Sequence, residues 1–102
     1  MTEILRIDKF HVPESSLDEF LAKVRETHDV LGHMDGVVAN DVGRLQQGDS
    51  HFNVVTVVKW RDRPAHDAAG RVMAERARTS GFDRAEFWER LGVEADLGTY
   101  AT

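Results

Sequence analysis

Residues 52–60 of the 102-residue chain read FNVVTVVKW, with four valines and almost no polar side chain. β-branched and aromatic residues favour an extended backbone, and an apolar run of this length is typical of a strand that is buried on both faces. This stretch therefore predicts an interior strand of a sheet. One face of the strand would carry Val54, Thr56, Val58 and Trp60, and the other Val55 and Val57.

The segment before this strand carries the pattern of an amphipathic helix. Ser16 followed by Glu19 matches a capping box, and Gly32 supplies the residue at which a helix can end in the left-handed conformation. Between them, apolar residues recur at helical spacing and form one stripe together with a single histidine. That stripe consists of Leu17, Phe20, Leu21, Val24, His28 and Leu31.

The remaining elements complete a known supersecondary order. Strands are predicted over 4–12, 37–45 and 93–100, and helices over 62–79 and 83–91, with Asp62 and Asp83 as N-caps. The order is strand, helix, strand, strand, helix, short helix, strand. It predicts an α+β, ferredoxin-like βαββαβ fold over residues 1–102, as a single domain whose four-stranded antiparallel sheet carries both long helices on one face.

Composition excludes several classes of protein. The chain has no cysteine, which removes disulfide scaffolds and thiolate chemistry and fits a reducing, cytoplasmic compartment. A net charge of −5 argues against a nucleic-acid surface. No signal peptide and no membrane span are expected. The five histidines contain no His-x-x-x-His pair, so no metal site is expected.

The apolar residues on both faces of the sheet predict a partner. The helices cover one face, so the other face of a monomer should be polar, yet both faces of this strand carry valines, Val54 and Val58 on one and Val55 and Val57 on the other. An exposed apolar patch of this kind marks an interface. We therefore expect a homodimer in which two sheets pack together.

These segments also resemble a known family. Residues 10–38, FHVPESSLDEFLAKVRETHDVLGHMDGVV, the valine-rich strand ending in Trp60, and the helix start Asp-Arg-Pro-Ala-His at 62–66 are similar to the antibiotic-biosynthesis monooxygenase (ABM) domain of the dimeric α+β barrel superfamily. That resemblance implies one of three kinds of protein: a cofactor-free oxygenase acting on small phenol- or quinol-like aromatics, a haem-degrading enzyme, or a member without a known reaction.

Two anomalies suggest catalytic residues. His28 lies in the apolar stripe of the first helix, and Arg76 lies within the apolar arc of the second. If both helices follow parallel central strands, His28 and Arg76 come to similar heights and could share a pocket. The imidazole would take a phenolic proton and the guanidinium would stabilise the anion. The alternatives are a hydrogen-bonded core histidine and an arginine that extends to water.

Four further residues are candidates for substrate binding: Asn53, Thr56, Trp60 and His66. Arg6 and Asp8 are additional polar candidates, and His11 could join Trp60 and His66 at the opposite end of the sheet. Haem-degrading relatives carry an Asn in the first strand and a Trp and a His in the second long helix. This chain has Ile7 and Asp8 in that part of the strand, no Trp in that helix, and there only His66, in the first turn and too early to match, so no haem cofactor is expected. Cofactor-free oxygenases often have an Asn where Thr56 stands. That departure keeps open a non-enzymatic reading, a ligand-binding or structural dimeric barrel.

Overall fold

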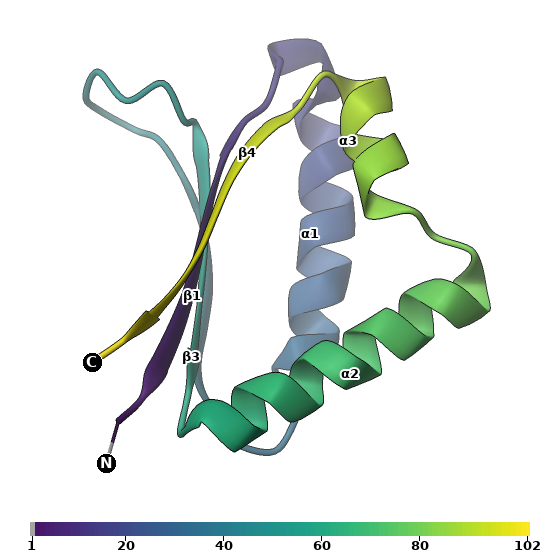
Figure 1. Ribbon diagram of the computed structural model, residues 1–102. Coiled ribbons are helices and arrows are strands. Elements are labelled where there is room, and N and C mark those ends of the chain that lie inside the picture. The colour runs from purple at the N-terminus through teal and green to yellow at the C-terminus, as the bar shows by residue number, and fades with distance from the viewer. Residues whose placement is uncertain (1) are drawn as a thin grey trace.

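The computed structural model describes residues 2–102 as one sheet with three helices (Figure 1). Along the chain the elements are β1 (Ile4–His11), a 3-10 turn η1 (Glu14–Ser16), α1 (Leu17–Leu31), β2 (Val37–Arg44), β3 (Val54–Trp60), α2 (Arg63–Ser80), α3 (Arg84–Leu91) and β4 (Glu94–Ala101). This is the predicted order, and the α+β ferredoxin-like class is confirmed.

The four strands form an antiparallel sheet in the order β2-β3-β1-β4. All three helices lie on the same side of it (Figure 1). The predicted alternation of β3 is confirmed, because its odd-numbered neighbours are half-buried while four residues are buried under the helix layer. Those four are Val54, Thr56, Val58 and Trp60. Residues paired with them on other strands share this helix-facing side, which we call the inner face.

Two hydrophobic clusters hold the helices to the inner face. The larger surrounds Phe20, whose ring meets that of Phe10 edge-on at 5.0 Å between centroids, and ties α1 and α3 to the sheet. The smaller joins Trp60 to the first two turns of α2 through Ala65 and Ala69. Beyond Ala69, α2 has no buried residue, so its second half is not packed onto the sheet.

The relative direction of the two long helices differs from the prediction. β1 and β3 pair antiparallel, so α1 and α2, which follow them, run in opposite senses. α1 descends toward the end of the sheet where α2 begins (Figure 1). His28 lies in the last turn of α1, whereas Arg76 lies 14 residues beyond Asp62, roughly 20 Å along α2 at 1.5 Å per residue. The expectation that His28 and Arg76 stand at one height is therefore wrong.

Two helix ends agree with the sequence-based prediction and two differ from it. Asp62 accepts the amide of Ala65 at 2.9 Å and Asp83 that of Glu86 at 3.1 Å, which confirms both N-caps. Ser16 makes no capping bond, since its hydroxyl donates to the carbonyl of Leu91 at 2.8 Å.

The expected left-handed residue at the end of α1 is also displaced along the chain. Gly32 is right-handed, with φ −64°. The positive φ of this turn belongs to Gly36 instead, at 86°.

A β-bulge in β2 changes which side chains face the helices. Val37 pairs with Trp60 and Ala39 with Lys59, so Val37 and Ala39 lie on opposite faces, whereas in a regular strand residues two apart share a face. The shift places Asn40, the partner of Val58, on the inner face. There it meets α1.

The chain is less compact than a monomer of its size. Its accessible surface is 6594 Å² and its radius of gyration 13.9 Å. A compact protein of this mass exposes roughly 5,800 Å² and has a radius of about 12.8 Å. The excess, about 800 Å², equals what one partner buries in a standard protein interface.

Candidate functional site

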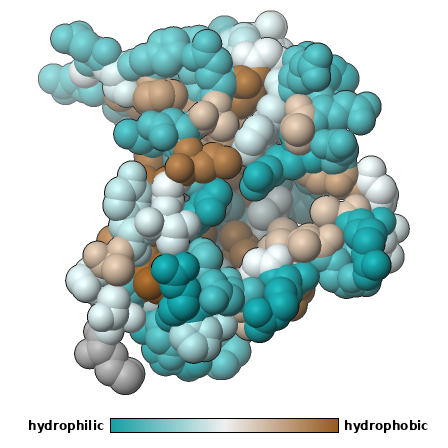
Figure 2. Space-filling model, viewed as in Figure 1, coloured by the Kyte–Doolittle hydropathy of each residue, from teal (hydrophilic) through white to brown (hydrophobic). Residues whose placement is uncertain are grey.

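A hollow separates the sheet from part of the helix layer (Figure 2). On its sheet side, Leu97 of β4 belongs to the inner face and is nevertheless 38% exposed. The helices therefore leave the β4 side of the inner face open.

Polar side chains lie in the middle of this inner face. We call Arg6, Asp8, Thr56 and Thr99 the inner-face cluster. Arg6 Nε donates to Asp8 Oδ1 at 2.8 Å, and Arg6 Nη1 donates to Thr99 Oγ1 at 3.3 Å. Thr56 is the cross-strand neighbour of Asp8 and is 5% exposed. One predicted binding residue, Thr56, thus stands beside an ion pair.

His28 is tied to the edge strand of the sheet. Asn40 Nδ2 donates to the His28 carbonyl at 2.6 Å, which orients the amide and turns Asn40 Oδ1 toward His28 Nδ1. The imidazole is half-buried. In its neutral form it therefore carries its proton on Nδ1 and leaves Nε2 as the free lone pair.

The His28–Asn40 pair and the inner-face cluster lie in one row across the sheet. Asn40 pairs with Val58, Val58 with Arg6, and Arg6 with Thr99. Two strand spacings put Asn40 roughly 10 Å from Arg6. Val58 between them is buried in the core, so packed side chains separate the two polar groups.

The other predicted residues occupy three places. Trp60 is buried against Ile4 and Val58 at the end of the sheet that also holds the last turn of α1. His66 is half-buried in the first turn of α2 and bonds to Asp67 at 2.8 Å. Arg76 is exposed on the unpacked half of α2.

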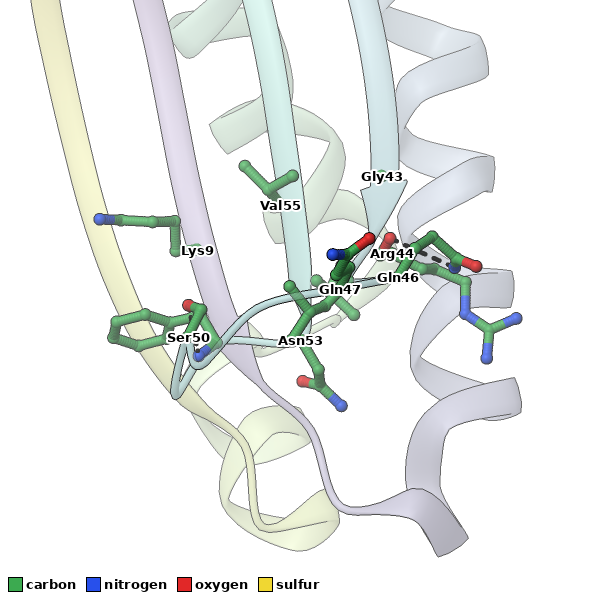
Figure 3. A pocket seen from close by; sticks show the side chains of 11 residues that line it. Lys9, Gly43, Arg44, Gln46, Gln47, Ser50, Asn53 and Val55 are labelled. Carbon is green, nitrogen blue, oxygen red and sulfur yellow. Dashed lines mark hydrogen bonds between the residues drawn. The ribbon is translucent and has the colours of Figure 1, made fainter.

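Asn53 lies at the end of the sheet opposite to Trp60. Its Oδ1 accepts the Val12 amide and its Nδ2 donates to the Val12 carbonyl, both at 2.8 Å. It also lines a hollow of about 480 Å³ beside the β2–β3 loop (Figure 3). Lys9 and Val55, which pair across β1 and β3, border that hollow from the sheet face that the helices leave bare.

His11 lies at this same end, far from Trp60, because β1 and β3 are antiparallel. Its ring stacks on His51 at 4.3 Å, and its Nδ1 meets the His51 carbonyl oxygen at 2.8 Å. His51 Nε2 bonds in turn to Glu94, and this bond lowers the pKa of the Glu94 carboxyl. The predicted grouping of His11 with Trp60 and His66 is therefore wrong.

A further hollow, of about 350 Å³, lies at the start of α2, where Ala65, Ala68 and Ala69 line it together with Met34 and Asp35 of the α1–β2 turn. Across residues 2–102, no group of three or more histidine or carboxylate side chains is placed to hold a metal ion. No helix in the same range has the length and apolar character needed to cross a membrane.

Solved structures share this architecture. A variant of SnoaB, a cofactor-independent oxygenase from Streptomyces nogalater, superposes with a TM-score of 0.64 at 19% identity, over 98% of this chain and 92% of its own. MhuD, a heme-degrader from Mycobacterium tuberculosis with two hemes in its active site, gives 0.69 at 15% identity, over 97% and 94%.

A dimeric ferredoxin-like protein from an uncultured marine organism gives a TM-score of 0.66 at 16% identity, over 99% of this chain and 94% of its own. No protein-family model and no curated protein matches the sequence. The likeness confirms the α+β, ferredoxin-like fold.

Two residues of these polar groups escaped sequence reasoning. Asn40 was missed because simple alternation along β2 does not reveal the bulge that turns it toward α1. Thr99 was missed because β4 has a weak strand pattern.

Proposed function

We propose that this protein is a cofactor-independent monooxygenase acting on a small phenol- or quinol-like aromatic bound between the sheet and the helices. The observation that carries the proposal is the oriented imidazole of His28. Asn40 holds its Nδ1 proton, so Nε2 is the atom that can accept a proton from a ligand. The fold shared with SnoaB supports the same class of reaction.

The proposed reaction needs only the substrate and molecular oxygen. His28 Nε2 removes the hydroxyl proton, and the electron-rich phenolate then reacts with oxygen at a ring carbon that carries hydrogen. One oxygen atom remains on the ring and the other leaves as water with the two substrate hydrogens. A phenol thereby becomes a quinone: the substrate supplies all four electrons that reduce the two oxygen atoms, so no further reductant is needed. Thr56, Trp60, His66 and Asn53 are the proposed substrate-binding residues, and Arg76 is the proposed anion-binding residue.

Oxygen consumption tests this function. A panel of hydroquinones and naphthols is incubated with the purified chain, and uptake is followed with an electrode. His28→Gln should reduce turnover at least tenfold, since general-base catalysis contributes on the order of a hundredfold or more. His33→Gln, an exposed histidine in the α1–β2 turn, is the matched control and should keep the wild-type rate.

Arg76 is tested separately, because it does not share the His28 end of the fold. Arg76→Gln should raise KM or lower kcat, whereas Arg71→Gln, an exposed arginine on the same helix, should not. Absence of uptake by the wild-type chain with every compound would contradict the enzyme proposal. It would favour the alternative, a non-enzymatic dimer that binds a small ligand or serves a structural role. The presence of Thr56 where cofactor-free oxygenases often have an Asn supports that alternative.

We further propose that the chain is a homodimer through the bare face of the sheet. Apolar side chains occupy the bare face on the three adjacent strands β3, β1 and β4. They are Leu5, Ile7, Val55, Val57 and Tyr100. Ion pairs of Lys9 with Asp96 and of Lys59 with Glu3 lie around them. An apolar centre with a charged rim is the arrangement of a protein interface. The proposed partners are thus a second copy and a small aromatic ligand.

A further inference from the structure

The two charges of the inner-face cluster occupy positions that the fold would ordinarily fill with apolar residues. β1 is a central strand, and its other inner-face residues, Ile4 and Phe10, belong to the buried core. Arg6 and Asp8 stand between them, with side chains only 32% and 16% exposed. Charged groups in the middle of a central strand are desolvated, which opposes folding.

Stability does not account for this pair. Replacing a half-buried ion pair by apolar residues of similar size is often neutral or stabilising, because the charges lose their hydration. The cluster also faces the open β4 side of the hollow, where Leu97 is uncovered. A ligand can therefore reach it.

The pair leaves one acceptor and one donor unused. Asp8 Oδ1 and Arg6 Nε are bonded to each other, and Arg6 Nη1 is bonded to Thr99. Among residues 2–102, Asp8 Oδ2 and Arg6 Nη2 have no hydrogen-bond partner. Neighbouring groups of this kind complement a ligand that presents a donor beside an acceptor.

We propose that Arg6 and Asp8 are the specificity-determining residues of the hollow, and that they select aromatic ligands carrying a hydrogen-bond donor next to a carbonyl, as in a lactam or a hydroxyl beside a ring ketone. Asp8 accepts the donor's hydrogen and Arg6 donates to the carbonyl. The inference rests on the proposed function in one respect, namely that the hollow binds a small aromatic molecule.

Binding of an unreactive probe tests the proposal apart from turnover. The probe 2-quinolinone has an N–H beside a carbonyl, and 1-methyl-2-quinolinone has the same ring with the donor blocked. Calorimetric titration of the wild-type chain should give a Kd about tenfold or more lower for 2-quinolinone, because a hydrogen bond to a charged group is lost in the analogue.

Two variants complete the design. The double variant Arg6→Leu, Asp8→Leu removes both charges together, so it should remain folded and bind the two compounds within about twofold of each other. Arg25→Gln, which removes an exposed charge of α1, should keep the wild-type ratio.

Four results would overturn the proposal: no binding of either probe, equal affinities in the wild type, an unchanged ratio in the double variant, or a clear loss of stability in it. Failure of oxygen uptake alone would leave the binding ratio intact, so the two proposals fail separately.

Discussion

At the scale of single residues, Asn40 determines which ring nitrogen of neutral His28 carries the proton. It donates to the His28 carbonyl and accepts from the His28 ring, and both residues are half-buried. Buried or half-buried polar groups that lose a partner pay a desolvation cost that solvent-exposed groups avoid. The same two bonds also select the tautomer of the ring.

Asn40→Ala should therefore have two effects. The free energy of unfolding should fall by about 1 to 2 kcal/mol, which denaturant unfolding measures. The neutral His28 ring should lose its preference for the Nδ1-protonated form, which nitrogen chemical shifts report. Gln47→Ala, an exposed amide in the β2–β3 loop, is the control and should change neither quantity. An unaltered His28 tautomer in Asn40→Ala would contradict the assigned role.

The carboxylate of Glu19 tests the contact between α1 and α3. Arg90 Nη2 donates to Glu19 Oε2 at 2.6 Å, and this bond lowers the pKa of Glu19. A lowered pKa in the folded state contributes stability above the unfolded pKa, and that contribution is lost as the pH falls through the folded value.

In Arg90→Gln the pKa of Glu19 should rise toward that of a free glutamate. Carboxyl chemical shifts followed through an acid titration measure it directly. Arg25→Gln removes another exposed arginine of α1 and should leave the pKa of Glu19 as it is. An identical Glu19 titration in wild type and Arg90→Gln would show that the contact does not persist in solution.

At the scale of elements, the turn between α1 and β2 depends on Gly36. Its φ is 86°, and a Cβ on this residue would come within 2.5 Å of the Cβ of Ala65 in α2. The turn therefore needs glycine for its backbone conformation and also for the close approach of the second helix. Gly48 in the β2–β3 loop has a similar need for positive φ, at 121°, with no atom within 4 Å of its Cβ position.

The two glycines separate these costs. Gly48→Ala should lower the free energy of unfolding by about 1 to 2 kcal/mol, the cost of a left-handed alanine. Gly36→Ala should lower it by roughly 1 to 3 kcal/mol more, because the added methyl overpacks the contact with Ala65. Thermal or urea unfolding of both variants measures the difference. Equal losses of unfolding free energy in the two variants would mean that α2 moves away from the added methyl group at no energetic cost, which would contradict the predicted overpacking.

The sequence predicted the type of the helices and strands correctly, but not how these elements are arranged relative to one another. The apolar periodicity of α1 and the valines of β3 fix their own type, and Asp62 and Asp83 cap their helices as local rules require. Ser16 departed because a hydroxyl beside the Leu91 carbonyl found a partner from a distant part of the chain. Strand direction and the β2 bulge likewise depend on long-range pairing, which no window of residues contains.

The candidate site divides in the same way. Thr56 and the polar candidates Arg6 and Asp8 were recognised, because charged or hydroxyl groups in apolar strands stand out in a sequence. The shared height of His28 and Arg76 was wrong because it rested on parallel central strands. The sequence thus identified candidate polar residues one by one, whereas the distances between them follow only from the sheet topology.

At the scale of the whole molecule, the excess surface of about 800 Å² and the apolar bare face lead to one expectation about assembly. A second copy that covered this face would bury Val57, at its centre, and Tyr100, which is 53% exposed on the edge strand β4. A charge introduced at either place would have to be desolvated on association.

Val57→Glu and Tyr100→Glu should therefore convert a dimer into a monomer at micromolar concentration, as sedimentation equilibrium measures. Val72→Glu places the same charge on exposed α2, across the sheet from the bare face, and should leave the mass unchanged. Circular dichroism confirms that each variant is folded. A wild-type chain that sediments as a monomer would contradict the proposed dimer.

The pairing of β1 with β4 joins the two ends of the described chain. Ile4 lies opposite Ala101, and the amide of Thr102 donates to the carbonyl of Glu3 at 3.1 Å. During synthesis on the ribosome, the central strand β1 must therefore wait for the last strand before its second edge is covered. The same proximity makes circular permutation feasible: a short linker between the termini and a cut at the exposed Gln47–Gly48 bond would keep all four strands, yet let β3 and the helices that follow emerge first.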